Sequence, residues 1–506
     1  MSLHVHQTTI EMQENPMPEN PVVSKVEKKE KRASLISCIA NLAKTILGAG
    51  ILTLPGAFKG AGLLWGIIFT VVTAVIGVFS LGLLGEMSQH GGLQPSLAAI
   101  GESAAGIRGK RFVDIILVGN NSGAMTSYLV IASTTMTNLV GSVIPRQAFV
   151  LLSVVIISPL CLVREVNTLR FSSIIALCAI SLLVVMIVLF AIPGLFEPCE
   201  VYANRTIIDC KGDVYMAKDP LSVLTQFVIF TNAYTCQQGA IPVIAELENP
   251  TRQRKFMVAL GAIGVVFPLF LLISIAGYTT FGDNVDSDIL LNYPAGFFVT
   301  MARIGIIIDV LTSFPLMVFF TRTSMVNLLQ AGGCCISNRP PEKVESSGTK
   351  KKGLFISDKV DIIATIAIVS ICTSISLAVS DLGIVAAMTG AIGATSLGYI
   401  LPGFLFWKIT GSNANELAAT GVEDFEEMKT QSISLSTMED EVSEMDELSE
   451  QLLNYDVVVP EAPAPLTPVH VEELASSLVM RNGAMALLVL GAILMPAGVA
   501  LTIFED

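Results

Sequence analysis

The sequence predicts an all-α polytopic membrane protein of about 11 transmembrane helices, ten of which form two inverted repeats of five. The first observation is composition: the 506 residues are 52% hydrophobic and 14% charged, whereas soluble domains carry roughly 25% charged residues. The second is that apolar runs of about 20 residues, enough to cross a bilayer as a helix, recur along nearly the whole chain. The third is that two of these runs are interrupted, five spans apart, which is typical of inverted-repeat membrane folds.

The apolar runs place the predicted spans along the chain. Their approximate bounds are 35–56, 63–85, 113–141, 149–163, 172–193, 221–245, 256–280, 297–330, 359–379, 383–406 and 483–504. Residues 1–33 are polar and the first apolar run is a full span, so we expect no cleavable signal peptide. The chain then divides into an amino-terminal tail at 1–33, a ten-helix transmembrane core at 34–407, a loop at 408–481, and an eleventh helix with a short outer tail at 482–506.

Basic residues orient the predicted spans, because cytoplasmic loops carry an excess of Lys and Arg. Lys and Arg cluster in alternate connections, at 25–32, 108–111, 164–170, 252–255 and 339–352. The intervening connections are poorer in basic residues, and one of them carries three aspartates at 283–288. We therefore expect the amino terminus in the cytoplasm and, because the number of spans is odd, the carboxyl terminus outside the cell or in the lumen of an organelle.

The net charge of −13 arises almost entirely from the loop before the last span. Residues 411–480 contain 16 Asp or Glu and a single Lys, a net charge of −15, which leaves +2 for the rest of the chain. The loop has few aromatic residues and a Pro-rich end, a composition typical of disordered segments. We expect a disordered cytoplasmic loop at 408–481, either a solvated linker or a segment that a trafficking or regulatory partner binds.

Two cysteines and a glycosylation sequon share one predicted outer loop at 194–220. Cys199 and Cys210 lie where an oxidising exterior or lumen would allow them to form a disulfide. Asn204 begins an Asn-X-Thr sequon between them, so we expect it to carry a glycan. Both features are consistent with a plasma membrane and with a vacuolar or lysosomal membrane.

The first span is broken near its middle by Gly48-Ala49-Gly50. In hydrocarbon every backbone N–H and C=O group must be paired internally, so a break is tolerated only against protein or a water-filled cavity. A broken helix in a membrane protein of many helices indicates a binding site. We therefore predict that Gly48, Ala49 and Gly50 line a substrate site.

The sixth span carries the second interruption. Polar residues gather at 231–238, and Gly239 and Pro242 follow. Proline in a helix interior removes one hydrogen bond and clashes with the preceding turn. Two broken helices that meet near the midplane would offer amino ends, which favour a carboxylate, and carboxyl ends, which favour a cation. A zwitterionic amino acid matches both kinds of end.

Three sequence patterns resemble the amino acid/auxin permease family. They are Asn41-Leu-x-x-x-Ile-x-Gly-x-Gly-Ile-Leu-x-Leu in the first span, Cys236-x-x-x-x-x-Pro242-x-x-x-Glu246-Leu in the sixth, and Pro315-Leu-Met-Val followed by Arg322 in the eighth. Within the family the chain is most similar to sodium-coupled neutral amino acid transporters and to vacuolar amino acid transporters, over roughly 34–406 and the last span. The resemblance implies a LeuT-like fold of ten core helices plus an eleventh, alternating access, and a substrate pocket lined by Thr231, Asn232, Tyr234 and Thr235.

Lys44 departs from the sodium-coupled branch of this family, in which an asparagine usually stands at the equivalent position. The resemblance places a hydroxyl of the eighth span, here Thr312 or Ser313, in the cation site of that branch. A lysine ammonium would occupy the space of the sodium ion, and two unit charges 4 Å apart repel by about 4 kcal/mol at an effective dielectric constant of about 20. Lys44 therefore argues against sodium coupling.

Asp309 is a predicted partner for Lys44. It lies within the eighth span at i, i+3 and i+4 to Thr312 and Ser313, so the three residues share one helix face. Ionisable residues inside a membrane are usually paired, and we predict that Lys44 and Asp309 compensate each other and replace the sodium ion. Protonation of Asp309 is then a candidate coupling event. Alternatively, Lys44 snorkels to the inner surface, or Asp309 pairs with Arg303 or faces a wet vestibule.

These expectations point to a secondary active transporter of small neutral amino acids, coupled to protons or independent of sodium. Two alternatives stay open: a sodium-coupled symporter, and a sensor of the same fold that signals through the acidic loop. We do not expect an enzyme, because the sequence holds no Ser-His-Asp, Cys-His or metal-ligand spacing and its four histidines lie outside the predicted spans. The expected partners are an amino acid, H⁺ (or Na⁺) and the lipid bilayer, with no cofactor, metal or nucleic acid.

Overall fold

The computed structural model of the chain describes residues 33–48, 50–91, 95–141, 143–162, 170–192, 210–331, 359–411 and 468–504. Within these ranges the chain is helical apart from short connections and one isolated β-bridge between Ala33 and Leu247. The predicted all-α fold class is confirmed. Close packing holds such helices together, because lipid is as apolar as the side chains that the helices bury.

Every predicted span falls on a helix or a pair of helices in the described part of the chain. The first half holds α1 (Leu35–Ile46), α2 (Gly50–Ala61), α3 (Leu63–Met87), η1 (Ser88–Gly91), α4 (Leu97–Val140), α5 (Arg146–Cys161), α6 (Arg170–Ala191), α8 (Pro220–Ala233) and α9 (Gln237–Ala245). The second half holds α10 (Arg252–Phe281), η3 (Gly282–Asn284), η4 (Ile289–Leu291), α11 (Phe297–Ala331), α12 (Lys359–Ala378), α13 (Leu382–Met388), the π-helical turns η5 (Thr389–Ala394) and η6 (Ser396–Ile400) that continue α13, and α15 (Pro468–Phe504).

Helix length and composition fit a membrane protein. In the described ranges, seven helices are long and apolar enough to cross a bilayer, and the pair α1 and α2, bent by 56° at its break, makes an eighth. The remaining predicted spans fall on α5, on α6, of which Cys178–Ala191 counts as a shorter apolar helix, and on the broken pair α8 and α9. Each half of a broken span is shorter than a whole span, so neither half alone is long enough to cross a bilayer.

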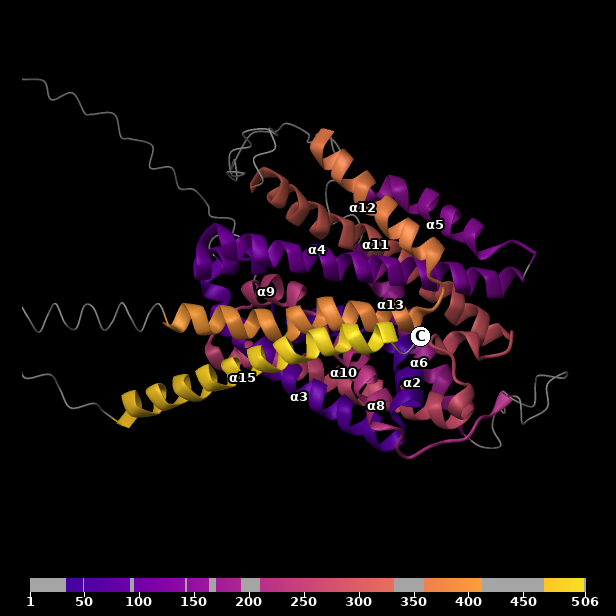
Figure 1. The fold of residues 1–506 in the computed structure, drawn as a ribbon, viewed down its shortest axis with the longest axis horizontal. Coiled ribbons are helices and arrows are strands. Elements are labelled where there is room, and N and C mark those ends of the chain that lie inside the picture. Colours follow the sequence, from indigo (N-terminus) through magenta and orange to yellow (C-terminus); the bar gives the residue numbers. More distant parts are fainter. Residues whose placement is uncertain are drawn as a thin grey trace, which may run out of the picture.

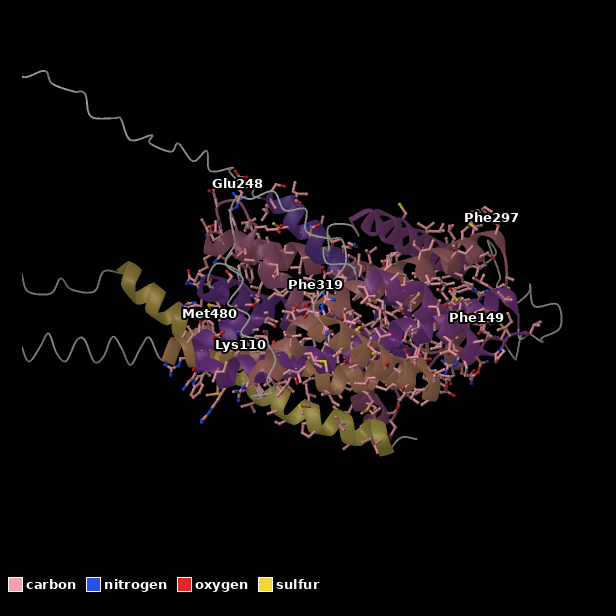
Figure 2. All side chains as sticks on the ribbon, turned by 90° about the horizontal axis from the view of Figure 1, so that it is seen from above. Lys110, Phe149, Glu248, Phe297, Phe319 and Met480 are labelled. Atoms are coloured by element: carbon pink, nitrogen blue, oxygen red, sulfur yellow. The ribbon has the colours of Figure 1, made fainter. Side chains whose placement is uncertain are left out.

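The two ends of the bundle carry different residues. Figure 2 shows Lys110, Glu248 and Met480 at one end and Phe149 and Phe297 at the other. We call these the inner and the outer end, after the orientation that the basic residues predict. In Figure 1, α9 lies toward the inner end whereas α2 and α8 lie toward the outer end, so the two halves of the second broken helix occupy opposite halves of the bundle.

Two boundaries differ from the sequence prediction. Helix α4 begins at Leu97 rather than near 113, because a kink at Ala105 and Gly106 joins a short helix to the span. Gly106 has a φ of +61°, a region that glycine enters without a Cβ clash. Helix α15 begins at Pro468, a residue type favoured in the first turn of a helix, so the end of the predicted 408–481 loop is helical. Residues 412–467 lie outside the described residues.

The packing of the helices brings the two breaks together. Helix α10 packs against α1, α2, α3 and α6, while α4 packs along α11 with α5 and α12 beside them. Between these groups α2 packs on α8. Apolar residues of the broken helices, such as Leu42, Ile51 and Phe230, are buried at this junction and form one core with Phe270 of α10.

Candidate functional site: the cavity at the two helix breaks

A cavity of about 90 Å³ lies where the two broken helices meet. We call it the central cavity. Residues of both breaks line it, together with residues of α4 and α11. They are Thr45, Ile46, Gly48, Gly50, Asn120, Ala124, Ser127, Tyr128, Asn232, Ala233, Thr235, Cys236, Gln238 and Met317. No charged side chain is among these lining residues, so the polar character of the cavity comes from hydroxyl and amide groups.

The second break is narrow and is held by local hydrogen bonds. Helix α8 ends at Ala233 and α9 begins at Gln237. The Thr235 N–H donates to the Asn232 carbonyl at 3.1 Å, and the Cys236 N–H donates to Oε1 of Gln237 at 3.0 Å. The predicted interruption ran to Pro242, but Pro242 is the sixth residue of α9, just as Pro55 is the sixth residue of α2. Each proline therefore lies one turn and a half into its half-helix instead of ending it.

Four helix ends face the central cavity. Helices α2 and α9 begin at Gly50 and Gln237, beside the cavity, and the first N–H groups of a helix have no intrahelical partner. These amino ends carry partial positive charge and favour an anion such as a carboxylate. Helices α1 and α8 end at Ile46 and Ala233, which line the cavity and bring the carbonyl ends, of partial negative charge, to the same place.

The structure brings together some of the predicted substrate-binding residues and separates others. Gly48, Gly50, Asn232 and Thr235 line the central cavity. Ala49 lies outside the described residues. The other two predicted residues, Thr231 and Tyr234, do not line it.

Thr231 and Tyr234 point into the packing around the break. The Thr231 hydroxyl lies 2.9 Å from the hydroxyl of Tyr399, with which it shares a hydrogen bond, and it donates to the Phe227 carbonyl at 3.1 Å. The Tyr234 ring packs edge-on against Phe270, with 5.1 Å between ring centroids. Thr231 is thus directed toward η6 and Tyr234 toward α10, away from the cavity wall that Asn232 and Thr235 help to form.

The sequence analysis missed the contribution of α4. Asn120, Ala124, Ser127 and Tyr128 of this helix line the cavity at positions i, i+4, i+7 and i+8, the spacing of one helix face. The available signal was the polar pair Asn120-Asn121 inside an apolar span, because a polar residue at membrane depth marks a functional site by default.

Two amide oxygens at the cavity have no hydrogen-bond partner. Asn120 is 5% exposed and its Oδ1 atom is unpartnered. The Oε1 atom of Gln238 is also unpartnered, while its Nε2 atom lies 3.4 Å from the sulfur of Met317. An unpaired buried acceptor costs about 1–3 kcal/mol. Both residues line the central cavity, and Oδ1 of Asn120 lies against Gly393 of η5.

Lys44 and Asp309 lie near residues that line the central cavity and within electrostatic range of each other. Both are partly buried, and their charges are close enough to interact electrostatically, although they are further apart than the 4.0 Å of an ion pair. Lys44 directly precedes Thr45, and Tyr128 lies within range of the Asp309 charge; Thr45 and Tyr128 both line the cavity. A change of charge at this pair would therefore be felt at the cavity.

The eighth-span residues form a local network on α11. The Ser313 hydroxyl donates to Oδ1 of Asp309 at 3.3 Å. The Thr312 hydroxyl donates instead to the backbone carbonyl of Ile308 at 2.7 Å, the usual partner of a helical threonine. Arg303, the alternative partner for Asp309, donates to the carbonyls of Leu290 and Tyr293 at 2.9 Å each, beyond the outer end of the helix.

The features of the predicted loop at 194–220 are described only in part. Cys210 is disulfide-bonded, but Cys199 and Asn204 lie outside the described residues, so their pairing and glycosylation stay predictions. In the described part of the chain, no group of three or more His, Cys, Asp or Glu side chains is placed to hold a metal ion.

Comparison with known proteins identifies the family of the chain. Residues 31–438 match the family described as transmembrane amino acid transporter protein. The chain is 27% identical over 418 residues to vacuolar amino acid transporter 6 of Saccharomyces cerevisiae, which covers 75% of this chain and 91% of that protein. It is 28% identical over 387 residues to vacuolar amino acid transporter 5 of Schizosaccharomyces pombe, covering 74% and 84%.

Among solved structures, the chain is similar to Mhp1, a nucleobase-cation-symport-1 family transporter, in a closed conformation, with a TM-score of 0.49, 11% identity, and 75% and 80% of the two chains covered. The family match spans most of the chain and includes both helix breaks, α4 and α11. The protein belongs to the transmembrane amino acid transporter family.

Proposed function

We propose that the protein is a secondary active transporter that moves small neutral amino acids through the central cavity by alternating access, driven by protons and without sodium. Membership of the family supports amino acid transport across a membrane, and an enzymatic function is excluded on the same ground. The observation that carries the proposal is the meeting of four helix ends at one small cavity that has no charged lining residue.

The lining residues support a neutral substrate. The helix ends offer complementary partners for the carboxylate and the ammonium of any amino acid. A charged substrate side chain would need a counter-charge in a buried cavity, because an unpaired buried charge is costly. The lining offers hydroxyl and amide groups only. A small, uncharged side chain that accepts or donates hydrogen bonds meets these groups best.

Lys44 and Asp309 support coupling to protons. A lysine ammonium beside the cavity already supplies one positive charge, so a sodium ion at the same place would be repelled by it. A carboxylate that faces this ammonium can accept a proton when the pair separates during the transport cycle. Asp309, held by Ser313, is therefore the proposed proton carrier, and Lys44 is its counter-charge.

The names of the relatives support a vacuolar membrane. Two of them are vacuolar amino acid transporters that match along most of their own length. With the amino terminus in the cytosol, the outer end would face an acidic lumen, and protons that move down their gradient would carry amino acids into the cytosol.

Uptake into proteoliposomes tests this proposal. The full chain is reconstituted and radiolabelled neutral amino acids are supplied, with either sodium or choline as the only monovalent cation and with or without an imposed pH gradient. We expect equal uptake in sodium and choline and a large increase with the pH gradient. Strict sodium dependence would refute proton coupling. Binding without any flux, measured on the same preparation, would instead support a sensor.

A further inference from the structure

A second cavity lies at the outer end, beneath the connection between α10 and α11. It has a volume of about 260 Å³. We call residues 282–296 the outer loop. The outer loop supplies Asp286, Ser287 and Asp288 to the cavity wall, and the start of α13 supplies Asp381. Three carboxyl groups thus share one cavity, which raises the question of how their charges are accommodated.

Of the three carboxyl groups, that of Asp288 lies in surroundings that disfavour its charged form. It is 1% exposed. One of its oxygens, Oδ1, accepts from the Leu290 N–H at 3.0 Å and caps the turn η4. The other oxygen, Oδ2, has no hydrogen-bond partner. A buried carboxylate with an unpaired oxygen is costly, whereas a carboxylic acid in the same position carries no charge.

Charged groups reach Asp288 from the neighbouring elements. Asp286 of the same loop is exposed, and Asp381 caps α13 by accepting from the Gly383 N–H at 2.6 Å. From α11, the buried Arg303 directs its Nη2 atom to two carbonyls of the loop. From α2, the Lys59 ammonium donates to the Val285 carbonyl at 3.2 Å.

Helix α4 adds only uncharged groups, Val130 and Thr134. The pKa of the Asp288 carboxyl is raised to about 7, first by burial and then by the charge of Asp286, against the lowering effects of the Leu290 N–H and of Arg303. Burial is thus the main cause of the raised pKa, and the Asp286 carboxylate has a larger effect on the Asp288 pKa than the Arg303 guanidinium has.

The outer loop is seated on the bundle by buried side chains. Val285, Ile289 and Leu290 are all 0% exposed. Asp286 and Ser287 also line a larger cavity of about 410 Å³, to which α2, α8, α13 and α15 contribute further walls. The loop therefore stands between two outer cavities, and its release from the bundle would open both of them.

We propose that Asp288 is a proton-binding site whose protonation holds the outer loop seated and whose ionisation releases it. This site is separate from Lys44 and Asp309, and its role in transport rests on the proposed proton-driven function. On the proposed orientation, protons in an acidic compartment would reach Asp288 first, and closure of the outer end would follow their arrival.

The direction of the pH effect follows from the two states of Asp288. In the released loop, exposed to water, its pKa returns toward about 3.9. Between about pH 4 and pH 7 the seated loop therefore binds a proton that the released loop does not. Seating is strongest at the acid side of this range and is lost as the pH rises through the upper value.

A buried cysteine reports whether the loop is seated. In full-length protein in nanodiscs, Ile289→Cys is labelled with a maleimide from about pH 5 to about pH 8. The exposed Ala295→Cys on the same loop corrects for the reactivity of the thiol, and the chain without either substitution gives the background. We expect the ratio of Ile289→Cys to Ala295→Cys labelling to rise about tenfold or more, with a midpoint near neutral pH.

Two carboxyl variants assign the proton. Asp288→Asn keeps the Oδ1 acceptor and removes the charge, so we expect low labelling at every pH. Asp286→Asn removes a neighbouring charge outside the core, and we expect it to keep the pH step. Two results would overturn the proposal: a labelling midpoint below about pH 5 when Asp286 and Asp288 are both present, or a full rise of labelling with pH in Asp288→Asn. The assay contains no substrate, so a failure of amino acid uptake would leave its result intact.

Discussion

A Cβ atom on Gly50 would lie 2.7 Å from the Cα of Ala233. Helix α2, which follows the first break, is thus in backbone contact with α8, which precedes the second break. No side chain fits between these helices, so the two breaks can lie this close only because residue 50 is a glycine and has no Cβ. The central cavity owes its small size and its four converging helix ends to this contact.

The contact predicts that Gly50→Ala damages the protein. The added methyl group must push α2 and α8 apart, and overpacking typically costs about 1–3 kcal/mol. We expect a lower melting temperature and at least a tenfold loss of transport. Gly264→Ala on α10 is the matched control, because nothing lies within 4 Å of the Cβ it would add. Thermal unfolding and uptake of both variants check this, and equal behaviour of the two would contradict the steric account.

Lys44 and Asp309 should show energetic coupling. Replacing either one leaves the other as an uncompensated charge in the membrane, whereas replacing both leaves none. We expect the double variant Lys44→Met/Asp309→Asn to be more stable than the sum of the single effects by about 0.5–3 kcal/mol. Unfolding free energies of the four proteins give the coupling. Lys44→Met combined with the remote Glu102→Gln should be additive, and additivity in the first pair as well would remove the basis for treating it as a unit.

Asn120 should contribute to substrate affinity. Asn120 lines the central cavity and its side-chain amide has an unpartnered oxygen, and loss of one hydrogen bond of about 1.4 kcal/mol is a tenfold change in an equilibrium constant. We expect Asn120→Ala to raise KM for small neutral amino acids about tenfold with a smaller change in kcat. Ser122→Ala, two residues along α4 and outside the cavity lining, should leave KM as it is. An unchanged KM in Asn120→Ala would show that the substrate does not reach α4.

Thr231 should matter for stability and not for binding. Thr231→Val removes the partner of the buried Tyr399 hydroxyl, which costs about 1–3 kcal/mol, while replacing both partners can be nearly neutral. We therefore expect Thr231→Val to lower the melting temperature, Thr231→Val/Tyr399→Phe to regain part of the loss, and KM to stay the same in both. A raised KM with normal stability would return Thr231 to the substrate site.

The orientation of the chain can be read from glycosylation. If the loop that contains Asn204 faces a lumen or the exterior, the chain carries a glycan there. We expect treatment with an N-glycosidase to increase the electrophoretic mobility of the native chain and to leave Asn204→Gln unchanged. A glycan that persists in Asn204→Gln would place another sequon outside, and the absence of any mobility shift in the native chain would count against this orientation.

The sequence predicts the fold class and the location of both breaks because each depends on local chemistry. Apolar runs set the spans, Gly48 and Gly50 weaken one helix, and the polar residues at 231–238 weaken the other. The facing of individual side chains depends on packing, which the sequence does not encode locally. Thr231 and Asn232 are adjacent in the chain, yet one bonds to Tyr399 and the other lines the cavity.

The part played by α4 could not be predicted from the breaks alone. Asn120 reaches the cavity because α4 packs along α11 beside the place where the two broken helices meet, a relationship between segments far apart in sequence. The spacing of Asp309 and Ser313 predicted a shared helix face, and the structure supplies what the spacing could not: the bond between them. Distances such as that from Lys44 to Asp309 are set by the tilt of whole helices.

The bridge at Ala33 ties two helices into one moving part. Ala33 donates to the Glu246 carbonyl at 2.7 Å and accepts from the Glu248 N–H at 2.9 Å, so the segment before α1 is fastened to the end of α9. At the other end of α1, a Cβ atom on Gly239 would lie 3.1 Å from Thr45. Because α1 is fastened to α9 at both of its ends, we expect the two half-helices to move as one rigid unit when the inner end opens.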